Sequence, residues 1–90
     1  MTTYRIAMVT SEELADYYAG MPPFSPLLVD IEANDKYEAI EKIESMTIFN
    51  DDGEEMWILN ECDIPTVQEF MDRANRLKIK IKENQIKKIA

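Results

Sequence analysis

The side chains that could do chemistry are carboxylates, because the 90-residue chain has 18 Asp and Glu residues, one Cys and no His. Without His there is no imidazole to act as a general base beside a Ser or Cys nucleophile, and none to ligate a metal. One Cys is too few for the usual Cys and His set of a structural zinc site. With only Gly20 and Gly53, the chain also lacks a glycine-rich phosphate-binding loop. The composition therefore disfavours most familiar catalytic arrangements.

Two acidic stretches remain as chemical candidates. Residues 50–55 (Asn-Asp-Asp-Gly-Glu-Glu) offer clustered oxygens to a divalent cation, but they lack the ligand spacing of an EF-hand loop. Cys62 lies between Glu61 and Asp63, whose charges disfavour the nucleophilic thiolate, so we expect a buried or half-exposed structural thiol. Carboxylate pairs of the glycosidase or nuclease kind need an enclosed pocket that so short a chain rarely builds. We predict no catalytic residue, no metal site and no cofactor.

Charge is divided unequally along the chain, whose net charge is −8. Residues 1–72 carry 17 acidic and 3 basic side chains, whereas residues 73–90 carry 7 basic side chains and one acidic side chain, Glu83. Such asymmetry can indicate contact with nucleic acid or with a charged partner. The favoured interpretation is a basic end that folds beside the acidic body and neutralises it.

Alternation of apolar and polar residues predicts the strands. Residues 3–9 are rich in β-forming types, and residues 27–33 alternate between an apolar face and a wet face with Leu28, Asp30 and Glu32. One wet face is typical of an antiparallel or mixed sheet. Residues 47–49 and 56–59 flank an Asp-Gly turn, which favours a hairpin.

Capping residues followed by apolar residues at helical spacing predict three helices. The caps are Thr10 with Glu13, Asn34 or Asp35, and Thr66 with Glu69. The expected buried stripes are Leu14, Tyr17, Tyr18 and Met21, then Ala39, Ile40, Ile43 and Met46, then Val67, Phe70, Met71, Ala74 and Leu77. Gly20 and the prolines after it end the first helix. Core packing is favoured for the aromatic residues, and Tyr18 and Trp57 are the best candidates for an interface among them.

Two segments are harder to interpret. Residues 21–26 form a loop with a formal Pro-x-x-Pro pattern, which we interpret as a stiff connector with Phe24 packed on the core. From Leu77, apolar residues alternate with lysines, which predicts a strand over 77–82, a turn near Glu83 and a further strand over 86–89. The competing interpretation is a helix that continues to residue 90, because basic residues suit a helix C-terminus.

These elements predict a single α+β domain over residues 1–90, with a basic C-terminal segment at residues 73–90. The sheet is mixed or antiparallel, with four to five strands and about three short helices in the order β-α-β-α-β-β-α-β. The longest apolar runs have about four residues, far below the roughly 20 of a membrane span. The sequence starts without a signal-peptide pattern and has a single Cys, so we expect a cytoplasmic protein.

The function that fits this pattern is that of a small, acidic, non-enzymatic protein-binding module. We expect an inhibitor or regulator, in the style of phage or mobile-element proteins, whose acidic surface mimics nucleic acid and binds a nucleic-acid-binding protein with a basic surface. The candidate partner-binding residues are Asp30, Glu32, Glu38, Glu41, Glu44, Asp51, Asp52, Glu54, Glu55 and Trp57.

Two alternatives use the basic C-terminal segment. A structural or assembly protein could form homodimers or larger oligomers by burying Ile79, Ile81, Ile86 and Ile89, or could join acidic to basic surfaces head to tail. A weak nucleic-acid binder could contact phosphates through Lys78, Lys80, Lys82, Lys87 and Lys88. Direct nucleic-acid binding is disfavoured because no aromatic residue is interleaved with these lysines and the acidic body repels the polymer.

Overall fold

The structure is a computed structural model that describes residues 1–21 and 26–89. Over these residues it has four strands, β1 (Thr2–Val9), β2 (Leu27–Ala33), β3 (Trp57–Ile58) and β4 (Ile86–Ile89). The helices are α1 (Ser11–Tyr18), α2 (Lys36–Glu44) and α3 (Val67–Arg76), with a 3-10 turn, η1 (Glu83–Gln85), before β4. The expected packing of Phe24 and the Pro-x-x-Pro pattern fall on residues outside the described part.

The strands form one mixed sheet in the order β3-β1-β2-β4. β1 is antiparallel to both of its neighbours, whereas β2 and β4 run parallel. The predicted α+β class with a mixed sheet and three helices is confirmed in the described residues. Among the same residues, no helix is long and apolar enough to cross a membrane.

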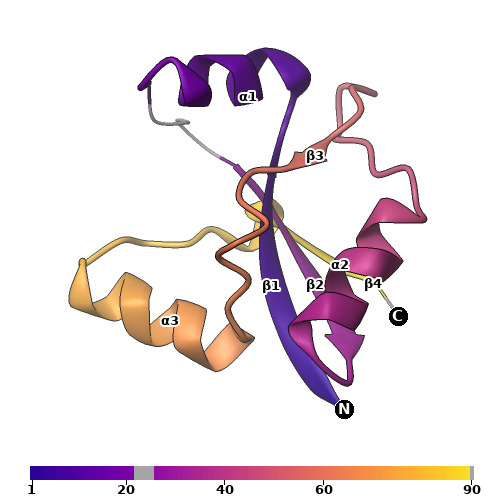
Figure 1. Ribbon diagram of the computed structural model, residues 1–90. Helices are drawn as coiled ribbons and strands as arrows, with labels where there is room; N and C mark the ends of the chain where they lie inside the picture. Colours follow the sequence, from indigo (N-terminus) through magenta and orange to yellow (C-terminus); the bar gives the residue numbers. More distant parts are fainter. Residues whose placement is uncertain (22–25, 90) are drawn as a thin grey trace.

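The two central strands divide the sheet into two faces, because Ile6 pairs with Val29 on one face and Arg5 pairs with Asp30 on the other. The first face packs against Ala39 and Ile43 of α2 and holds the main core. The buried residues of this core are Ile6, Met8, Val29, Ile31, Ala33, Ala39, Ile43, Ile48, Met56 and Ile64. α3 packs against the second face, so α2 and α3 lie on opposite sides of the sheet (Figure 1).

The second face of β2 is not wet, contrary to the sequence prediction. Leu28 is 2% exposed and Asp30 is 6% exposed, which leaves Glu32 as the solvent-facing residue. Arg5 donates from Nε to Asp30 Oδ1 at 2.7 Å and from Nη2 to Asp30 Oδ2 at 2.8 Å. These hydrogen bonds raise the pKa of Arg5 above its usual range. The two charges can be buried because each satisfies the other in a two-point contact.

The same arginine connects the sheet to α3. Its Nη1 donates to Met71 Sδ at 3.3 Å, and its guanidinium carbon lies 5.6 Å from the centre of the Phe70 ring. Its backbone N–H donates to the carbonyl of Pro65 at 2.9 Å, so the chain that enters α3 is also paired with β1. Arg5 therefore fixes both the start and the packed side of α3.

All three predicted helix starts are confirmed. Thr10 with Glu13, and Thr66 with Glu69, form complete capping boxes, and Asp35 rather than Asn34 caps α2. The predicted stripes are only partly buried. In α2 and α3 the buried residues are Ala39, Ile43 and Ala74, and α1 has none.

After α3, the predicted turn near Glu83 and the predicted strand over 86–89 are confirmed as η1 and β4. The predicted strand over 77–82 is wrong, and so is the competing helix that continues to residue 90. The Lys78 N–H donates to the Asn75 carbonyl and the Ile79 N–H donates to the Ala74 carbonyl, which is the Schellman pattern that closes a helix. Lys78 has a φ of 56°, in the left-handed region where glycine is the usual residue. With Lys in that position, the sequence shows no glycine signal for the helix end.

The predicted hairpin is present only as a short pairing. The Met56 N–H donates to the Ile48 carbonyl at 2.7 Å, Phe49 bridges to Glu55, and Gly53 has a φ of 80° in the turn. The strand that follows, β3, pairs with β1. Residues 47–49 therefore contribute an isolated bridge to this region and not a full strand.

Candidate functional site

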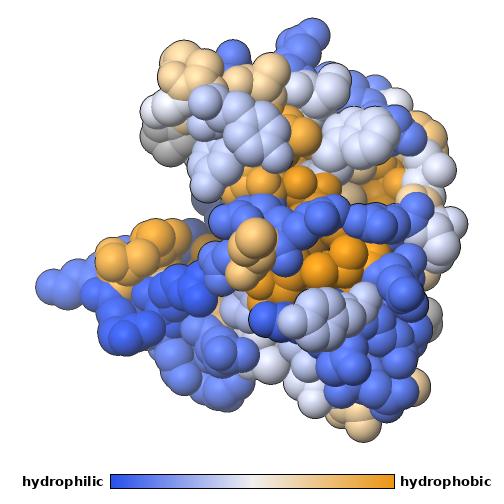
Figure 2. Space-filling model, in the orientation of Figure 1, coloured by the Kyte–Doolittle hydropathy of each residue, from blue (hydrophilic) through white to orange (hydrophobic). Residues whose placement is uncertain are grey.

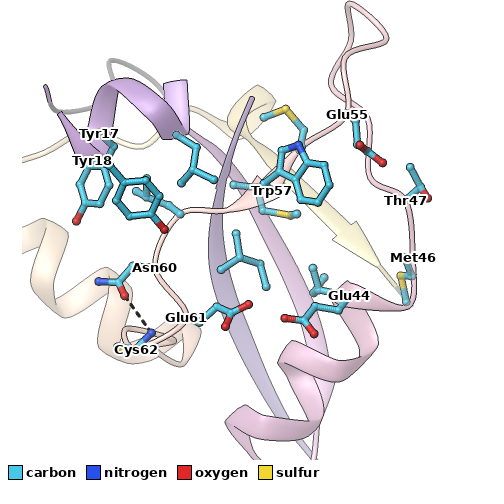
Figure 3. A pocket seen from close by; sticks show the side chains of 16 residues that line it. Tyr17, Tyr18, Glu44, Met46, Thr47, Glu55, Trp57, Asn60, Glu61 and Cys62 are labelled. Carbon is cyan, nitrogen blue, oxygen red and sulfur yellow. Dashed lines mark hydrogen bonds between the residues drawn. The ribbon is translucent and has the colours of Figure 1, made fainter. Parts of the chain in front are cut away.

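A groove of about 900 Å³ opens between α1, the C-terminal end of α2 and the segment around β3 (Figure 3). Its floor includes the buried core residues Met8, Ile43 and Met56. Leu14 and Tyr17 of α1 line one wall. Figure 2 shows apolar surface in this hollow, bordered by hydrophilic residues. These core residues are themselves buried, and the half-buried side chains of Leu14, Ile58 and Leu59 supply the apolar surface that the groove exposes.

Aromatic side chains stand at the margins of the groove. Tyr18 is 75% exposed and Trp57 is 47% exposed, and the ring centres of Tyr17 and Tyr18 lie 6.0 Å apart. α1 leaves these rings accessible because it lies across the end of the sheet and not against one of its faces (Figure 1). Trp57 precedes Ile58, whose side chain packs against the core, and neighbouring strand residues point to opposite sides. The expectation that the α1 stripe is buried is wrong.

Two carboxylates from separate elements meet in the groove. Glu44 at the end of α2 and Glu61 in the loop after β3 point toward each other (Figure 3). A hydrogen bond with Glu61, and then repulsion by its charge, raise the pKa of Glu44. Glu55 lines the same groove, and none of the described residues that line it is basic. The groove therefore combines an apolar floor with uncompensated negative charge.

A bulge in the chain places Glu61 in this position. The Leu59 N–H donates to the Ala7 carbonyl of β1 at 2.9 Å, and the chain rejoins β1 where Pro65 accepts from Arg5. Between these two contacts, residues 60–63 bulge outward and Ile64 returns to the core, and the Asn60 side chain accepts from the Cys62 N–H at 3.0 Å. The bulge brings Glu61 and Cys62 to the groove.

The predicted partner-binding residues separate into three groups. Three line the groove: Glu44, Glu55 and Trp57. Others lie outside it with their side chains exposed or half-buried: Glu32, Glu38, Glu41, Asp51, Asp52 and Glu54. Asp30 was predicted to lie on the accessible surface, and this is wrong because Arg5 binds its carboxylate inside the fold. The prediction also omitted Glu61 and treated Tyr17 as core.

Glu38 is already engaged within the chain. Its carboxylate accepts from the Asn34 side chain at 3.0 Å and lies 3.2 Å from Lys42 Nζ. These contacts lower the pKa of Glu38, the bond with Asn34 most of all. Its charge is therefore partly neutralised before any partner arrives.

The sequence offers two candidate stretches for chemistry, Cys62 and the acidic turn at residues 50–55. Cys62 is exposed, so the expectation of a buried or half-exposed thiol is wrong. In the acidic turn, the Asn50 side-chain oxygen accepts from the backbone N–H groups of Asp52 and Glu54 at 3.0 and 2.9 Å, and so organises the loop. The described residues contain no group of three or more Cys, Asp or Glu side chains that could hold a metal ion.

The basic C-terminal segment divides into a docked part and an exposed part. In β4, Lys87 and Lys88 lie beside Val29 and Asp30 of β2, and Ile89 packs against the core. The five predicted phosphate-contacting lysines are exposed: Lys78, Lys80, Lys82, Lys87 and Lys88. Ile89 is half-buried against the chain's own core, which reduces its part in the predicted oligomer contact, whereas Ile79 remains 53% exposed.

The lining of the groove suits non-covalent recognition. Half-exposed aromatic rings beside an apolar floor are typical anchors of protein interfaces, and unpaired carboxylates favour a cationic partner. Comparisons of this chain with protein families, with curated proteins and with solved structures found no match.

Proposed function

We propose that this protein is a non-enzymatic, acidic protein-binding module that regulates or inhibits a partner with a basic surface. A nucleic-acid-binding protein is the class of partner whose surface fits this charge best, because its site has evolved to accept phosphates. The groove, with Trp57 and its carboxylates, is the proposed contact site.

The observation that carries this proposal is the pair Glu44 and Glu61 beside an accessible apolar floor. A hydrogen bond with Glu61, and then repulsion by its charge, raise the pKa of Glu44, so the two facing carboxylates repel each other once both are ionised. A Lys or Arg side chain from a partner would relieve this repulsion and hydrogen-bond to both groups. An apolar neighbour of that cation would cover the groove floor and contact Trp57. Both features favour the same occupant, a basic surface with an apolar residue in it.

The test compares two variants with equal changes in charge. The groove variant combines Glu44→Gln, Glu55→Gln and Glu61→Gln. Its matched control replaces three acids outside the groove, Glu32→Gln, Asp51→Asn and Asp52→Asn, all of which are exposed. The groove variant should fold at least as well as the wild type because it removes a repulsive pair. Loss of binding would therefore not reflect loss of structure.

Each protein is used to capture proteins from a native lysate, and the captured proteins are quantified by mass spectrometry. We expect a basic protein that is retained by the wild type and the control, lost by the groove variant, and bound again when it is purified. Binding should reduce or shift the fluorescence of Trp57, the only tryptophan of the chain. Equal loss with both variants would show that general acidity, and not the groove, drives binding. Equal retention by both would overturn the proposal.

A further inference from the structure

The segment 77–82 is the most accessible apolar part of the basic end. Leu77 is 64% exposed and Ile79 is 53% exposed, and the lysines between and after them are exposed as well. Exposed apolar surface that is rimmed by polar residues often marks a protein interaction site. Figure 2 shows apolar residues on the left of this view, where Figure 1 places the chain that follows α3.

This segment complements the groove in both charge and polarity. It presents lysines together with Leu77 and Ile79, whereas the groove presents Glu44, Glu55 and Glu61 around an apolar floor. The occupant expected for the groove, a basic surface containing apolar residues, is therefore present in the chain itself.

The segment cannot reach the groove of its own molecule. It follows α3, which packs against the second face of the sheet through Phe70, whereas the groove lies on the side of α2 and contains Ile43 (Figure 1). Its other end is held by η1 and by the pairing of β4 with β2. Moving the segment to the groove would require α3 or β4 to detach, so only another copy can supply it without unfolding.

We infer that residues 77–82 of one copy dock in the groove of a second copy, so that the protein associates with itself head to tail. The inference rests on the proposed function in that both use the groove. Self-association then competes with the partner, and the free protein keeps its own apolar surfaces covered. Two different surfaces meet in such a contact, which is the heterologous type of assembly.

The contact is small and partly electrostatic, so we expect weak association that salt reduces. Sedimentation of the wild type from micromolar to millimolar concentrations should show a mass that rises with concentration and falls with added salt. The segment variant Leu77→Ser with Ile79→Ser should lower the association constant at least about tenfold, as should the groove variant. Both changed side chains of the segment variant are exposed, so the fold is retained. The matched control with Glu32, Asp51 and Asp52 replaced should associate like the wild type.

Mixing the two variants gives the decisive measurement. The segment variant keeps an intact groove and the groove variant keeps an intact segment, so an equimolar mixture should form a complex that neither forms alone. A mixture that remains monomeric, or a wild type that remains monomeric at millimolar concentration, would overturn the inference. The proposed function is tested separately, since the segment variant should still capture the basic partner. A wild type that captures the basic partner but does not self-associate would refute only the second-copy contact.

Discussion

Replacing Asp30 with Asn tests the strongest claim about the fold, that Arg5 is held by one buried carboxylate. The variant keeps the size of the side chain but removes its charge, and it offers one acceptor oxygen where the carboxylate offers two. The amide NH₂ group then faces a guanidinium N–H that currently donates at 2.8 Å. The Arg5 charge would remain buried without a counter-charge.

The expected cost follows from the burial of both partners. Arg5 and Asp30 are each 6% exposed, so solvent screens the pair poorly. Removing one member of such a pair typically costs about 3–5 kcal/mol, because the other charge is left uncompensated. The total stability of a small domain is about 5–15 kcal/mol, so Asp30→Asn should remove a large part of it. Glu32→Gln, an exposed change on the same strand, should stay within about 0.5 kcal/mol.

Urea unfolding, followed by Trp57 fluorescence and by circular dichroism, measures this difference. With a slope of about 1–3 kcal/mol per molar urea, a loss of about 3 kcal/mol moves the midpoint down by about 1–3 M. The double variant Arg5→Met with Asp30→Leu should recover wild-type stability or exceed it, because apolar replacement of a whole buried pair is often neutral or stabilising. Equal midpoints for Asp30→Asn and Glu32→Gln would refute the buried pair.

Three further predictions follow from local geometry. Lys78→Gly should stabilise the protein by about 0.5–1 kcal/mol in urea unfolding, because glycine adopts the left-handed conformation of this position without the strain that a side chain causes. Lys80→Gly should not stabilise the protein. Thr66→Ala should cost about 1 kcal/mol in the same assay, because it removes the cap of α3. Because the pKa of Glu44 is raised, its interaction with Glu61 stabilises the fold at low pH, and this contribution is lost as pH rises through that raised value. Glu44→Gln should therefore gain stability relative to the wild type as pH rises from about 4 to 7, and parallel pH profiles would contradict the shared proton.

Local signals in the sequence predicted most of the fold. Capping boxes at Thr10 and Thr66 and the alternation over 27–33 specify helix starts and a strand through contacts within a few residues. The predictions were wrong where a contact between residues far apart in the sequence determines the structure, or where a residue type is uncommon at its position. Asp30 looks solvent-facing until Arg5, 25 residues away, is placed opposite it. Lys78 occupies the left-handed position that ends α3, and a glycine there would have made this helix end predictable.

The candidate site was harder to predict for the same reason. Glu44 and Glu61 come from α2 and from a bulge after β3, and no short-range pattern relates them. The bulge forms because Leu59 bonds to Ala7 and Pro65 bonds to Arg5. Ala7 and Arg5 lie closer together along the chain than Leu59 and Pro65 do, so the residues between Leu59 and Pro65 cannot all pair with β1. Trp57 and Tyr18 were recognisable as amphipathic residues, but their exposure depends on α1 lying across the sheet end.

The distribution of the acids suggests that two sets of carboxylates act at different stages of binding. Arg5 pairs with Asp30 and Lys42 pairs with Glu38, whereas the turn residues Asp51 and Asp52 are among the acids whose exposed charges can act at a distance. Exposed charges act over a Debye length of about 8 Å and mainly raise the association rate. Groove residues touch the bound partner and mainly set the dissociation rate. We therefore expect neutralising the turn acids to slow association with little effect on dissociation, and the groove variant to do the reverse.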